Sequence, residues 1–411
     1  MGRLFFASVD TLPRLGGVSM MTHHFANAFA RKGHDVVVLG TDEAAIPPGM
    51  SADYELVQYE RADPGRREGP AWTVIEKPNV LARLSQLWRE HRFHHAVALH
   101  PYYFGLPLLD LAHRHGAKLS TVFHGYELRS QLLMKARWRA WRLGAANMGP
   151  SLSDQTIKLA RQSDEVLVNS RYTAKLVQKT GSRAPLRIIG CGLDIREATR
   201  EIAVSAVGHE HRKRRARVKL GIPPKAPVVG TLGRLVKSKN PDQLIRLLAL
   251  NPAIYALIAG SGDEHKPLLE LAAKLEVLDR LRLVTVADEN EKWELLRAMD
   301  VFCLLSSEQS GGQVEGFGIV LLEASCAGVP TIAARSGGMV DVVEDRETGL
   351  TVPPLNVSAL NQAVQNLLEQ PETASNYVSA SRERVLQQFN YDSIAEEMCF
   401  LWSLPQQGRF L

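Results

Sequence analysis

The sequence predicts an α/β protein made of two doubly wound units, each with a parallel β-sheet covered by helices on both faces. Short apolar runs alternate with helical patterns, and this alternation is typical of parallel sheets. The same rhythm begins again after the proline-rich stretch Gly221–Pro227. A length of 411 residues exceeds the usual size of one domain, so each half is large enough to bury its own core.

The first unit is expected over residues 1–190. Its opening strand, Leu4–Val9, leads into a helix over Val18–Lys32 and then a strand over Asp35–Leu39. Further strands are predicted at Ala96–Leu99, Leu119–Phe123, Glu165–Val168 and Arg187–Ile189.

The second unit is expected over residues 191–391. Its predicted strands are Val228–Leu232, Ala256–Ala259, Leu281–Val286, Val301–Leu305 and Pro330–Ala333. Its predicted helices are Pro241–Leu250, Pro267–Leu275, Lys292–Met299 and Gly318–Ala327. A last amphipathic helix, Ser393–Leu404, falls outside this rhythm, and the segment 392–411 is expected to complete the first unit.

Composition and the N-terminus favour a protein of the cytoplasm. No apolar run approaches the roughly 18 residues of a membrane-spanning helix. The apolar stretch Leu4–Val9 runs directly into Asp10, unlike a secretory signal. Because the four cysteines have no paired spacing, we expect reduced, buried thiols instead of disulfides or a zinc site at Cys191, Cys303, Cys326 and Cys399.

The formal net charge of +5 conceals an asymmetry between the halves. Residues 1–224 contain 33 Lys and Arg against 20 Asp and Glu, a charge of +13. Residues 225–411 contain 16 against 24, a charge of −8. A basic half could face anionic lipid, nucleic acid or a phosphorylated substrate, and charge alone does not choose among them.

Two glycines, Gly16 and Gly17, precede the first predicted helix. Glycine lets the backbone approach a ligand closely, and a helix N-terminus offers unpaired N–H groups and the positive end of the helix dipole. The G-x-G-x-x-G spacing of dinucleotide-binding loops is missing. The pair therefore indicates either a phosphate-binding turn or a turn that has no ligand.

A second candidate loop follows the strand Val228–Leu232. It begins with Gly233-Arg234, and Lys239 lies five residues further on, before a predicted helix. A guanidinium and an ammonium at the mouth of a parallel sheet can neutralise a diphosphate, and each charge-assisted hydrogen bond contributes about 1.5–3 kcal/mol. Without any other motif, two solvated surface cations would be the better interpretation.

The most specific motif runs from Glu315 to Glu323 and reads Glu-Gly-Phe-Gly-Ile-Val-Leu-Leu-Glu. A helix is expected to begin near Gly318, and the amides of Gly318, Ile319 and Val320 can hold a phosphate. Carboxylates accept hydrogen bonds from sugar hydroxyls. Glu323 lies in an apolar helix, where burial without a partner is costly, so either a ribose diol or a structural salt bridge must supply one.

One histidine stands out among the 13 in the chain. His124 directly follows the strand Leu119–Phe123 in the segment His-Gly-Tyr-Glu. Ligands of parallel sheets bind beyond the carboxyl ends of the strands. A lone histidine is more often structural, so its position is what singles out His124.

Together these motifs resemble glycosyltransferase family 4. That resemblance implies the GT-B fold, in which two Rossmann-like domains face each other across a cleft, and it covers nearly the whole chain. The stretch Ser310–Gly318 is similar to bacterial phosphatidylinositol-mannoside mannosyltransferases, whose glycine-rich loop before the first Glu is also extended. The matching pieces are Gly16-Gly17, His124-Gly125, Gly190–Asp194, Gly233–Val236 with Lys239, Ala259–Gly262 and Glu315–Glu323, which fits the family's E-x7-E pattern.

The resemblance implies roles for the residues around the reaction. Gly16 and Gly17 would pack against the donor phosphates. His124 would bind the donor sugar near its C6 hydroxyl. Arg234 and Lys239 would neutralise the diphosphate and its departing charge.

The remaining roles concern the donor. Glu315 would hold the hydroxyls of the donor sugar and Glu323 the ribose diol, while backbone near Val286 would recognise the base. The sequence departs from the family's pattern at Asn240, where Lys-Gly is common, and this change puts the loop conformation in doubt. Further donor-binding positions are Gly233, Gly318, Ile319 and Val320.

No Asp-x-Asp triplet occurs in the sequence, although enzymes that place a divalent cation on the diphosphate commonly need one. Arg234 and Lys239 are therefore expected to replace the metal, and no cofactor is expected. No carboxylate is evidently placed as a nucleophile, so we expect a front-face transfer in which the leaving phosphate helps to deprotonate the acceptor. Retention of configuration follows from the resemblance alone.

Two basic segments bear on the partners. Leu132–Leu143 combines basic and aromatic residues at helical spacing, which suits a helix at a membrane surface, but a core helix with a cationic outer face is slightly favoured. His209–Lys219 is expected to be a solvated helix or loop. Neither resembles a nucleic-acid-binding module. The expected partners are a nucleotide-sugar donor and a glycan or lipid-linked acceptor, with peripheral attachment to the inner membrane face left open.

The leading hypothesis is thus a glycosyltransferase that uses GDP-mannose or a UDP-hexose. Two other classes remain open: a nucleotide-sugar epimerase of the same fold, and a non-catalytic protein that binds membranes or polyanions. The donor, the acceptor and the oligomeric state are not determined by the sequence.

Overall fold

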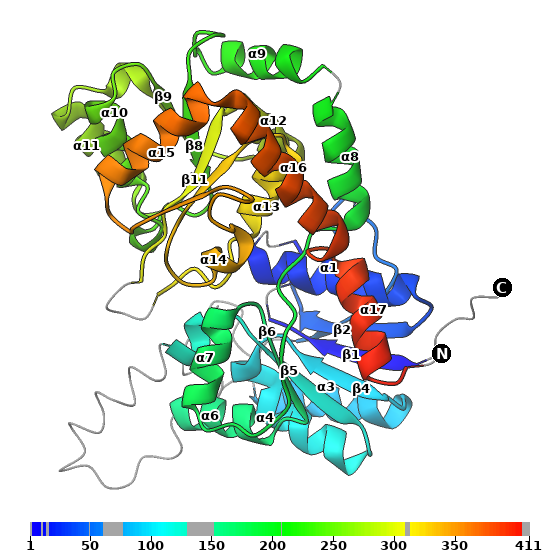
Figure 1. The fold of residues 1–411 in the computed structure, drawn as a ribbon. Helices are drawn as coiled ribbons and strands as arrows, with labels where there is room; N and C mark the ends of the chain where they lie inside the picture. The colour runs from blue at the N-terminus through cyan, green and yellow to red at the C-terminus, as the bar shows by residue number, and fades with distance from the viewer. Residues whose placement is uncertain are drawn as a thin grey trace, which may run out of the picture. The chain divides into compact units, whose positions relative to one another are not determined.

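The computed structural model describes residues 2–9, 11–13, 16–48, 50–60, 77–129, 152–206, 208–308 and 313–404. The basic segment Leu132–Leu143 and the loop positions 310–312 lie outside the described residues. The chain forms two compact units, Met1–Gly192 with Tyr391–Leu411, and Leu193–Asn390 (Figure 1). The sequence analysis put the first boundary at 190/191 and gave 392–411 to the first unit; in the structure the boundaries fall at 192/193 and 390/391.

The first unit contains a seven-stranded parallel sheet within the described residues, in the order β3-β2-β1-β4-β5-β6-β7. Strand order reverses between β1 and β4, and in doubly wound sheets ligands bind at such a switch point. The strands are β1 (Arg3–Ala7), β2 (Asp35–Thr41), β3 (Glu55–Tyr59), β4 (His95–Ala98), β5 (Lys118–Phe123), β6 (Glu165–Val168) and β7 (Leu186–Ile188).

Helices cover both faces of this sheet, which explains why its central strands are apolar along their whole length. Leu4, Phe5, Phe6 and Ala7 of β1 are all fully buried. The helices are α1 (Gly17–Arg31), α3 (Lys77–Glu90), α4 (Pro101–Arg114), α6 (Leu152–Gln162), α7 (Arg171–Lys179) and α17 (Tyr391–Leu401).

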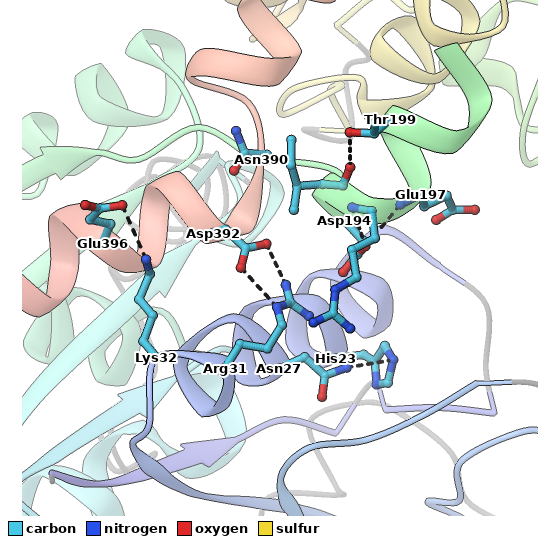
Figure 2. Close-up of polar contacts among 12 residues, drawn as sticks. His23, Asn27, Arg31, Lys32, Asp194, Glu197, Thr199, Asn390, Asp392 and Glu396 are labelled. Atoms are coloured by element: carbon cyan, nitrogen blue, oxygen red, sulfur yellow. Dashed lines mark hydrogen bonds and ion pairs between the residues drawn. The ribbon is translucent and has the colours of Figure 1, made fainter. Parts of the chain in front are cut away.

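The C-terminal helix α17 packs on α1 of the first unit (Figure 1). Arg31 of α1 donates two hydrogen bonds to the carboxylate of Asp392, at 3.0 and 2.6 Å, and Lys32 reaches Glu396 at 3.4 Å (Figure 2). Just beyond the helix, the indole of Trp402 stacks on Phe29 at 5.3 Å and on His95 at 3.9 Å between ring centroids. These contacts make α17 part of the core of the first unit.

The second unit contains a six-stranded parallel sheet within the described residues, in the order β10-β9-β8-β11-β12-β13, with its switch point between β8 and β11. Its strands are β8 (Val228–Leu232), β9 (Tyr255–Ala259), β10 (Leu281–Val284), β11 (Val301–Leu304), β12 (Thr331–Ala334) and β13 (Leu350–Val352). Its helices are α8 (Ile195–Ala206), α9 (His209–Lys219), α10 (Asp242–Leu250), α11 (His265–Lys274), α12 (Glu289–Ala298), α13 (Ile319–Cys326), α14 (Met339–Val342), α15 (Val357–Glu369) and α16 (Pro371–Gln387), with 3₁₀ turns η1 (Lys237–Lys239) and η2 (Leu278–Arg280).

The predicted fold class is confirmed, and each predicted strand agrees with an observed one to within two residues at either end. The edge strands β3 and β13 were missed. The four cysteines are buried and form no disulfide. Among the described residues, no helix has both the length and the apolar character that crossing a membrane requires.

The basic segment His209–Lys219 is a helix, α9, but it is not simply solvated. Arg217 is only 4% exposed and donates to the carboxylate of Asp300 at 2.6 Å, and Lys213 approaches the same carboxylate at 2.5 Å. The basic pattern therefore includes side chains that hold α9 against the start of β11.

Candidate active site

The predicted residues of the second unit lie at the carboxyl edge of its sheet, on both sides of the switch point. Gly233 and Arg234 follow β8 directly, Val286 follows β10, and the segment that contains Glu315 connects β11 to α13. Parallel strands end at the same edge, so loops distant in sequence meet there.

Two of the predicted residues are in direct contact across the switch point. The Nζ atom of Lys239 donates a hydrogen bond of 2.9 Å to Oε2 of Glu315. The two side chains are 23% and 20% exposed, so an ion can reach both. Lys239 also folds over Gly233, where a Cβ atom would lie 3.4 Å from Nζ. The structure thus brings a cation and a carboxylate together where a ligand is expected.

Arg234 belongs to the same loop and its side chain is exposed. Its guanidinium makes no ion pair or hydrogen bond with any described residue. An arginine beside a lysine and not neutralised by a carboxylate of its own is suited to binding a polyanion such as a diphosphate.

Asn240 explains how the loop tolerates its departure from the family's pattern. Its backbone lies in the left-handed region, with φ of 47°, a conformation that glycine adopts freely and asparagine tolerates better than other residues. The buried side-chain amide donates to the carbonyl of Leu305 and to Oγ of Ser307, both at 2.8 Å. Asn240 therefore keeps the turn that presents Lys239 and anchors it to the end of β11.

Glu315 is held through its backbone by the loop after β12. Its carbonyl accepts a hydrogen bond of 2.9 Å from the amide of Gly338. A Cβ atom on Gly337, whose φ is 59°, would lie 2.2 Å from that carbonyl oxygen, so a side chain there would displace Glu315. The sequence analysis missed this support, although a Gly-Gly pair soon after a predicted strand is a signal that could have found it.

Helix α13 begins at the predicted position. Gly318 is its N-cap, with φ of 96°, and no side chain caps the first turn. Phe317, which precedes it, is buried and packs edge-on against Phe389 at 5.4 Å. The amides of Ile319 and Val320 lie in a helical turn without an acidic residue, which suits a bound phosphate.

Glu323 has a partner within the protein. Its Oε1 accepts a hydrogen bond of 2.6 Å from Nζ of Lys292 on α12, and Lys292 also pairs with Glu289. Burial raises the pKa of Glu323. Burial by itself would lower the pKa of Lys292, but the carboxylates of Glu323 and Glu289 outweigh it and raise that pKa, so the lysine stays charged. The cost of burying Glu323 is therefore met by a salt bridge, without a ligand.

Val286 lies half-buried between β10 and α12. The loop there is fixed by reciprocal caps: the side chain of Asp288 accepts from the amide of Glu291 at 2.9 Å, and Glu291 accepts from Ala287 at 2.6 Å. These two bonds satisfy backbone amides at the start of α12 and hold the backbone next to Val286 in one conformation.

In the first unit, His124 lies at the carboxyl end of β5 and is half-buried. Its Nε2 is 3.1 Å from the carbonyl of Leu99, which follows β4; because a carbonyl can only accept, Nε2 carries the hydrogen. The backbone of His124 is held at both ends, since its amide donates to Glu127 at 3.1 Å and its carbonyl accepts from Asn169 at 3.2 Å. These contacts orient the ring.

Gly16 and Gly17 are exposed at the start of α1, with Gly16 as its N-cap. A Cβ atom at Gly17 would meet nothing within 4 Å. Open space at a helix N-terminus without an acidic first turn is compatible with the predicted phosphate contact. Among the described residues, no group of three or more His, Cys, Asp or Glu side chains is arranged to hold a metal ion.

Comparison with known proteins agrees with these features. The family model "Glycosyltransferase Family 4" matches residues 15–197, and "Glycosyl transferases group 1" matches residues 212–384. The GDP-mannose-dependent alpha-(1-6)-phosphatidylinositol monomannoside mannosyltransferase of Mycolicibacterium smegmatis is 29% identical over 421 aligned positions, which cover 97% of this chain and 98% of that enzyme. A glycogen synthase of Mycobacterium tuberculosis is 26% identical, covering 96% of this chain and 92% of that enzyme.

The fold is also found in solved structures. The Anabaena protein HepE, in complex with UDP and glucose, superposes with a TM-score of 0.73 at 19% identity, covering 98% of this chain and 100% of that one. Such a likeness identifies the GT-B fold. The two family models, together with the mannosyltransferase relative and the Glu315–Glu323 motif, show that the chain belongs to glycosyltransferase family 4 and is an enzyme of that family.

Proposed function

We propose that the enzyme moves a hexosyl unit from a nucleotide-diphosphate sugar to an acceptor hydroxyl, with retention of configuration and without a metal ion. The contact between Lys239 and Glu315 supports this most directly. It places a cation for the diphosphate and a carboxylate for the sugar within 2.9 Å of each other, at the edge of the sheet where ligands bind.

Donor binding would exchange the partners of this pair. The oxygens of the β-phosphate bind the ammonium of Lys239, the guanidinium of Arg234 and the first backbone amides of α13. The carboxylate of Glu315, released from Lys239, then accepts hydrogen bonds from the sugar hydroxyls. The free oxygen of Glu323 serves the ribose diol in the same way, since only its Oε1 is hydrogen-bonded to Lys292.

The chemical step transfers the sugar and leaves negative charge on the departing phosphate. The bond between the anomeric carbon and the phosphate oxygen breaks while the acceptor oxygen attacks the same face, and the departing phosphate oxygen takes the acceptor's proton. The products are the glycoside and the nucleoside diphosphate. Negative charge grows on the leaving phosphate, so Arg234 and Lys239 stabilise the transition state more than the bound donor.

The relatives narrow the choice of substrates. The mannosyltransferase relative is named for GDP-mannose and for a phosphatidylinositol-linked acceptor. We therefore place GDP-mannose first and a UDP-hexose second as donor, and a lipid-linked or cell-envelope glycan as acceptor. The formal net charge of +13 in residues 1–224 is compatible with an anionic acceptor or an anionic surface.

Calorimetric titration with GDP-mannose, UDP-glucose and ADP-glucose, all in EDTA, tests the donor site. One donor should bind, and Arg234→Ala should weaken it tenfold or more, because a charge-assisted contact is lost. Lys237→Ala, an exposed cation in the same loop, is the matched control. NMR of the glycoside then reports the anomeric configuration, which should equal that of the donor.

Each other class of function has its own signature in this experiment. A change in the sugar nucleotide without any acceptor would indicate an epimerase. Binding to anionic vesicles but to none of the three nucleotide sugars would indicate a non-catalytic binding protein. Binding that needs a divalent cation would contradict the metal-independent mechanism.

A further inference from the structure

Lys292 of α12 is the buried partner of Glu323. Its Nζ atom donates a hydrogen bond of 2.6 Å to Oε1 of Glu323. The two side chains are only 11% and 14% exposed, so water and salt screen their charges weakly. The packing of α12 beside α13 therefore places an ammonium against the carboxylate that the proposed function assigns to the ribose diol.

The ammonium is held in place from two further directions. It also pairs with Glu289, the first residue of α12. It lies over the indole of Trp293, 5.0 Å from the ring centroid, which is within the range of a cation–π contact. That indole in turn donates a hydrogen bond of 2.9 Å to Glu197 of α8. Lys292 therefore has little freedom to turn away from Glu323.

The charges around Glu323 do not balance. The ammonium of Lys292 interacts with three carboxylates, those of Glu323, Glu289 and Glu197. Burial raises the pKa of Glu323, Lys292 lowers it, and the other two carboxylates raise it further. The thiol of Cys326, on the same helix, is neutral because burial raises its pKa to about 12. Of these groups, Lys292 is the one that favours the ionised form of Glu323.

The ionisation of Glu323 matters for binding a ribose. A carboxylate can accept hydrogen bonds from both hydroxyls of a diol, and bonds to a charged acceptor are about twice as strong as neutral ones. Glu323 follows Ile319, the first residue of α13, by four positions, or about 6 Å along the helix axis. A phosphate at the first turn of α13 and a ribose at Glu323 can therefore belong to one nucleotide.

We propose that Lys292 is a positioning residue for donor binding: it keeps Glu323 ionised and fixes its Oε1, so that the other oxygen accepts the ribose hydroxyls. This inference rests on the proposed function, in which Glu323 binds the ribose. It adds that the preference for a ribose depends on a lysine that acts only through Glu323.

Isothermal titration of the full chain between pH 5 and pH 9 tests the proposal. One pair of ligands is GDP and 2′,3′-dideoxy-GDP, and the second pair is UDP and its dideoxy analogue. The ratio of the two dissociation constants within a pair isolates the ribose, because the titration of the phosphates is common to both ligands. In the wild-type protein the dideoxy nucleotide should bind tenfold or more weakly while Glu323 is ionised, and this ratio should fall as the carboxylate takes a proton.

Two variants should move the midpoint of this fall in opposite directions. Lys292→Met should raise it by about 1–3 pH units, whereas Glu289→Gln removes a neighbouring carboxylate and should lower it. A loss of folding stability alone would weaken both nucleotides together and leave the midpoint in place. Lys219→Met, which removes an exposed lysine paired with Glu294 of α12, is the matched control. An unmoved midpoint in Lys292→Met would overturn the proposal.

Carbon-13 NMR of glutamate-labelled protein keeps the proposal testable even where Lys292→Met does not fold. The carboxyl signal of Glu323, assigned by its disappearance in Glu323→Gln, should be that of a carboxylate at pH 7 in the wild-type protein. A protonated Glu323 at that pH would also overturn the proposal. Equal binding of both members of each pair at every pH would instead contradict the role of Glu323 in the proposed function, and this inference with it.

Discussion

The ion pair between Lys239 and Glu315 shows how two loops share one site. Each partner satisfies the other while the donor is absent, yet both remain accessible enough to change partners. Because the pair is about a fifth exposed, water screens it, and it contributes little to stability. Its importance is that it keeps an ammonium and a carboxylate accessible at the candidate site.

Replacing Lys239 should therefore affect catalysis far more than folding. We expect Lys239→Met to lower kcat/KM by about 10²–10³-fold, the usual effect of losing one group that stabilises developing charge, with little change in Tm. Steady-state kinetics with the bound donor identified above would measure this. Lys237→Met, in the same 3₁₀ turn, should retain full activity; equal losses in both variants would contradict the assignment.

Glu323 shows where sequence reasoning stops at the residue scale. The apolar run around it correctly predicts a carboxylate that needs a partner, but the prediction favoured a ribose diol over the salt bridge that the structure contains. Lys292 is 31 positions away and on another helix, so no local pattern connects the two. Only the packing of α12 beside α13 identifies the partner.

Removing Lys292 should leave Glu323 buried without compensation. We expect Lys292→Met to lower the free energy of unfolding by about 3–5 kcal/mol, and the double variant with Glu323→Gln to recover much of that loss. Denaturant unfolding of the four members of this double-mutant cycle measures the coupling. Additive effects would show that the two side chains do not interact.

At the scale of elements, the turn η1 with Asn240 carries the most information. The sequence marks position 240 as a departure from the family, but it cannot show that the backbone stays left-handed. The structure shows that asparagine preserves the turn and adds two hydrogen bonds to the end of β11. A substitution that seemed to alter the loop in fact fixes it.

Substitutions at Asn240 should separate conformation from hydrogen bonding. Asn240→Gly keeps the left-handed turn and loses two bonds, which should cost about 1–2 kcal/mol of stability. Asn240→Ala adds backbone strain and should cost about 2–4 kcal/mol, with a larger fall in kcat/KM because Lys239 is displaced. Unfolding and kinetics on the two variants test this; an alanine variant as stable as the glycine variant would refute the strain.

Helix α9 differs from the sequence prediction for a different reason, which is a contact with a distant carboxylate. Its dense run of basic residues suggested a solvated segment, yet Lys213 and Arg217 both pair with Asp300 at the start of β11. Charge density along a sequence does not reveal which cations face a distant carboxylate. Lys213 and Arg217 are four residues apart, which places them on one face of a helix. The sequence does not show which carboxylate lies opposite that face.

At the scale of the whole molecule, the alternation of strands and helices was sufficient to predict both sheets, and its failures are confined to two edges. β13 has three residues, and β3 contains the polar residues Glu55 and Gln58, which an edge strand can expose. Neither has the continuous apolar run that burial on both faces gives to a central strand. These two edge strands therefore lack the apolar run that predicted the others.

His95 in the first unit should contribute to the pH dependence of stability. Burial lowers the pKa of His95 to about 3, against an ordinary value near 6.5, so the folded state keeps this ring neutral between Ser120 and Trp402. The stabilisation is complete above pH 6.5 and is lost as pH falls, by up to about 1.4 kcal/mol per unit, or about 2 kcal/mol by pH 5.

Calorimetric unfolding between pH 5 and 8 would measure this slope. His95→Gln should be less stable at pH 8 but should have a shallower pH dependence, by about one proton. His211→Gln, whose ring is exposed on α9, should leave the slope unchanged. An unaltered slope in His95→Gln would assign the acid sensitivity to other groups.

The return of α17 to the first unit also has a consequence for synthesis on the ribosome. Phe29 and His95 are made early, but the indole that stacks on both arrives only with residue 402, after the entire second unit has emerged. The nascent chain must therefore keep an incomplete N-terminal core while nearly 200 further residues are translated. A premature stop late in the message would thus damage the part of the protein that was made first.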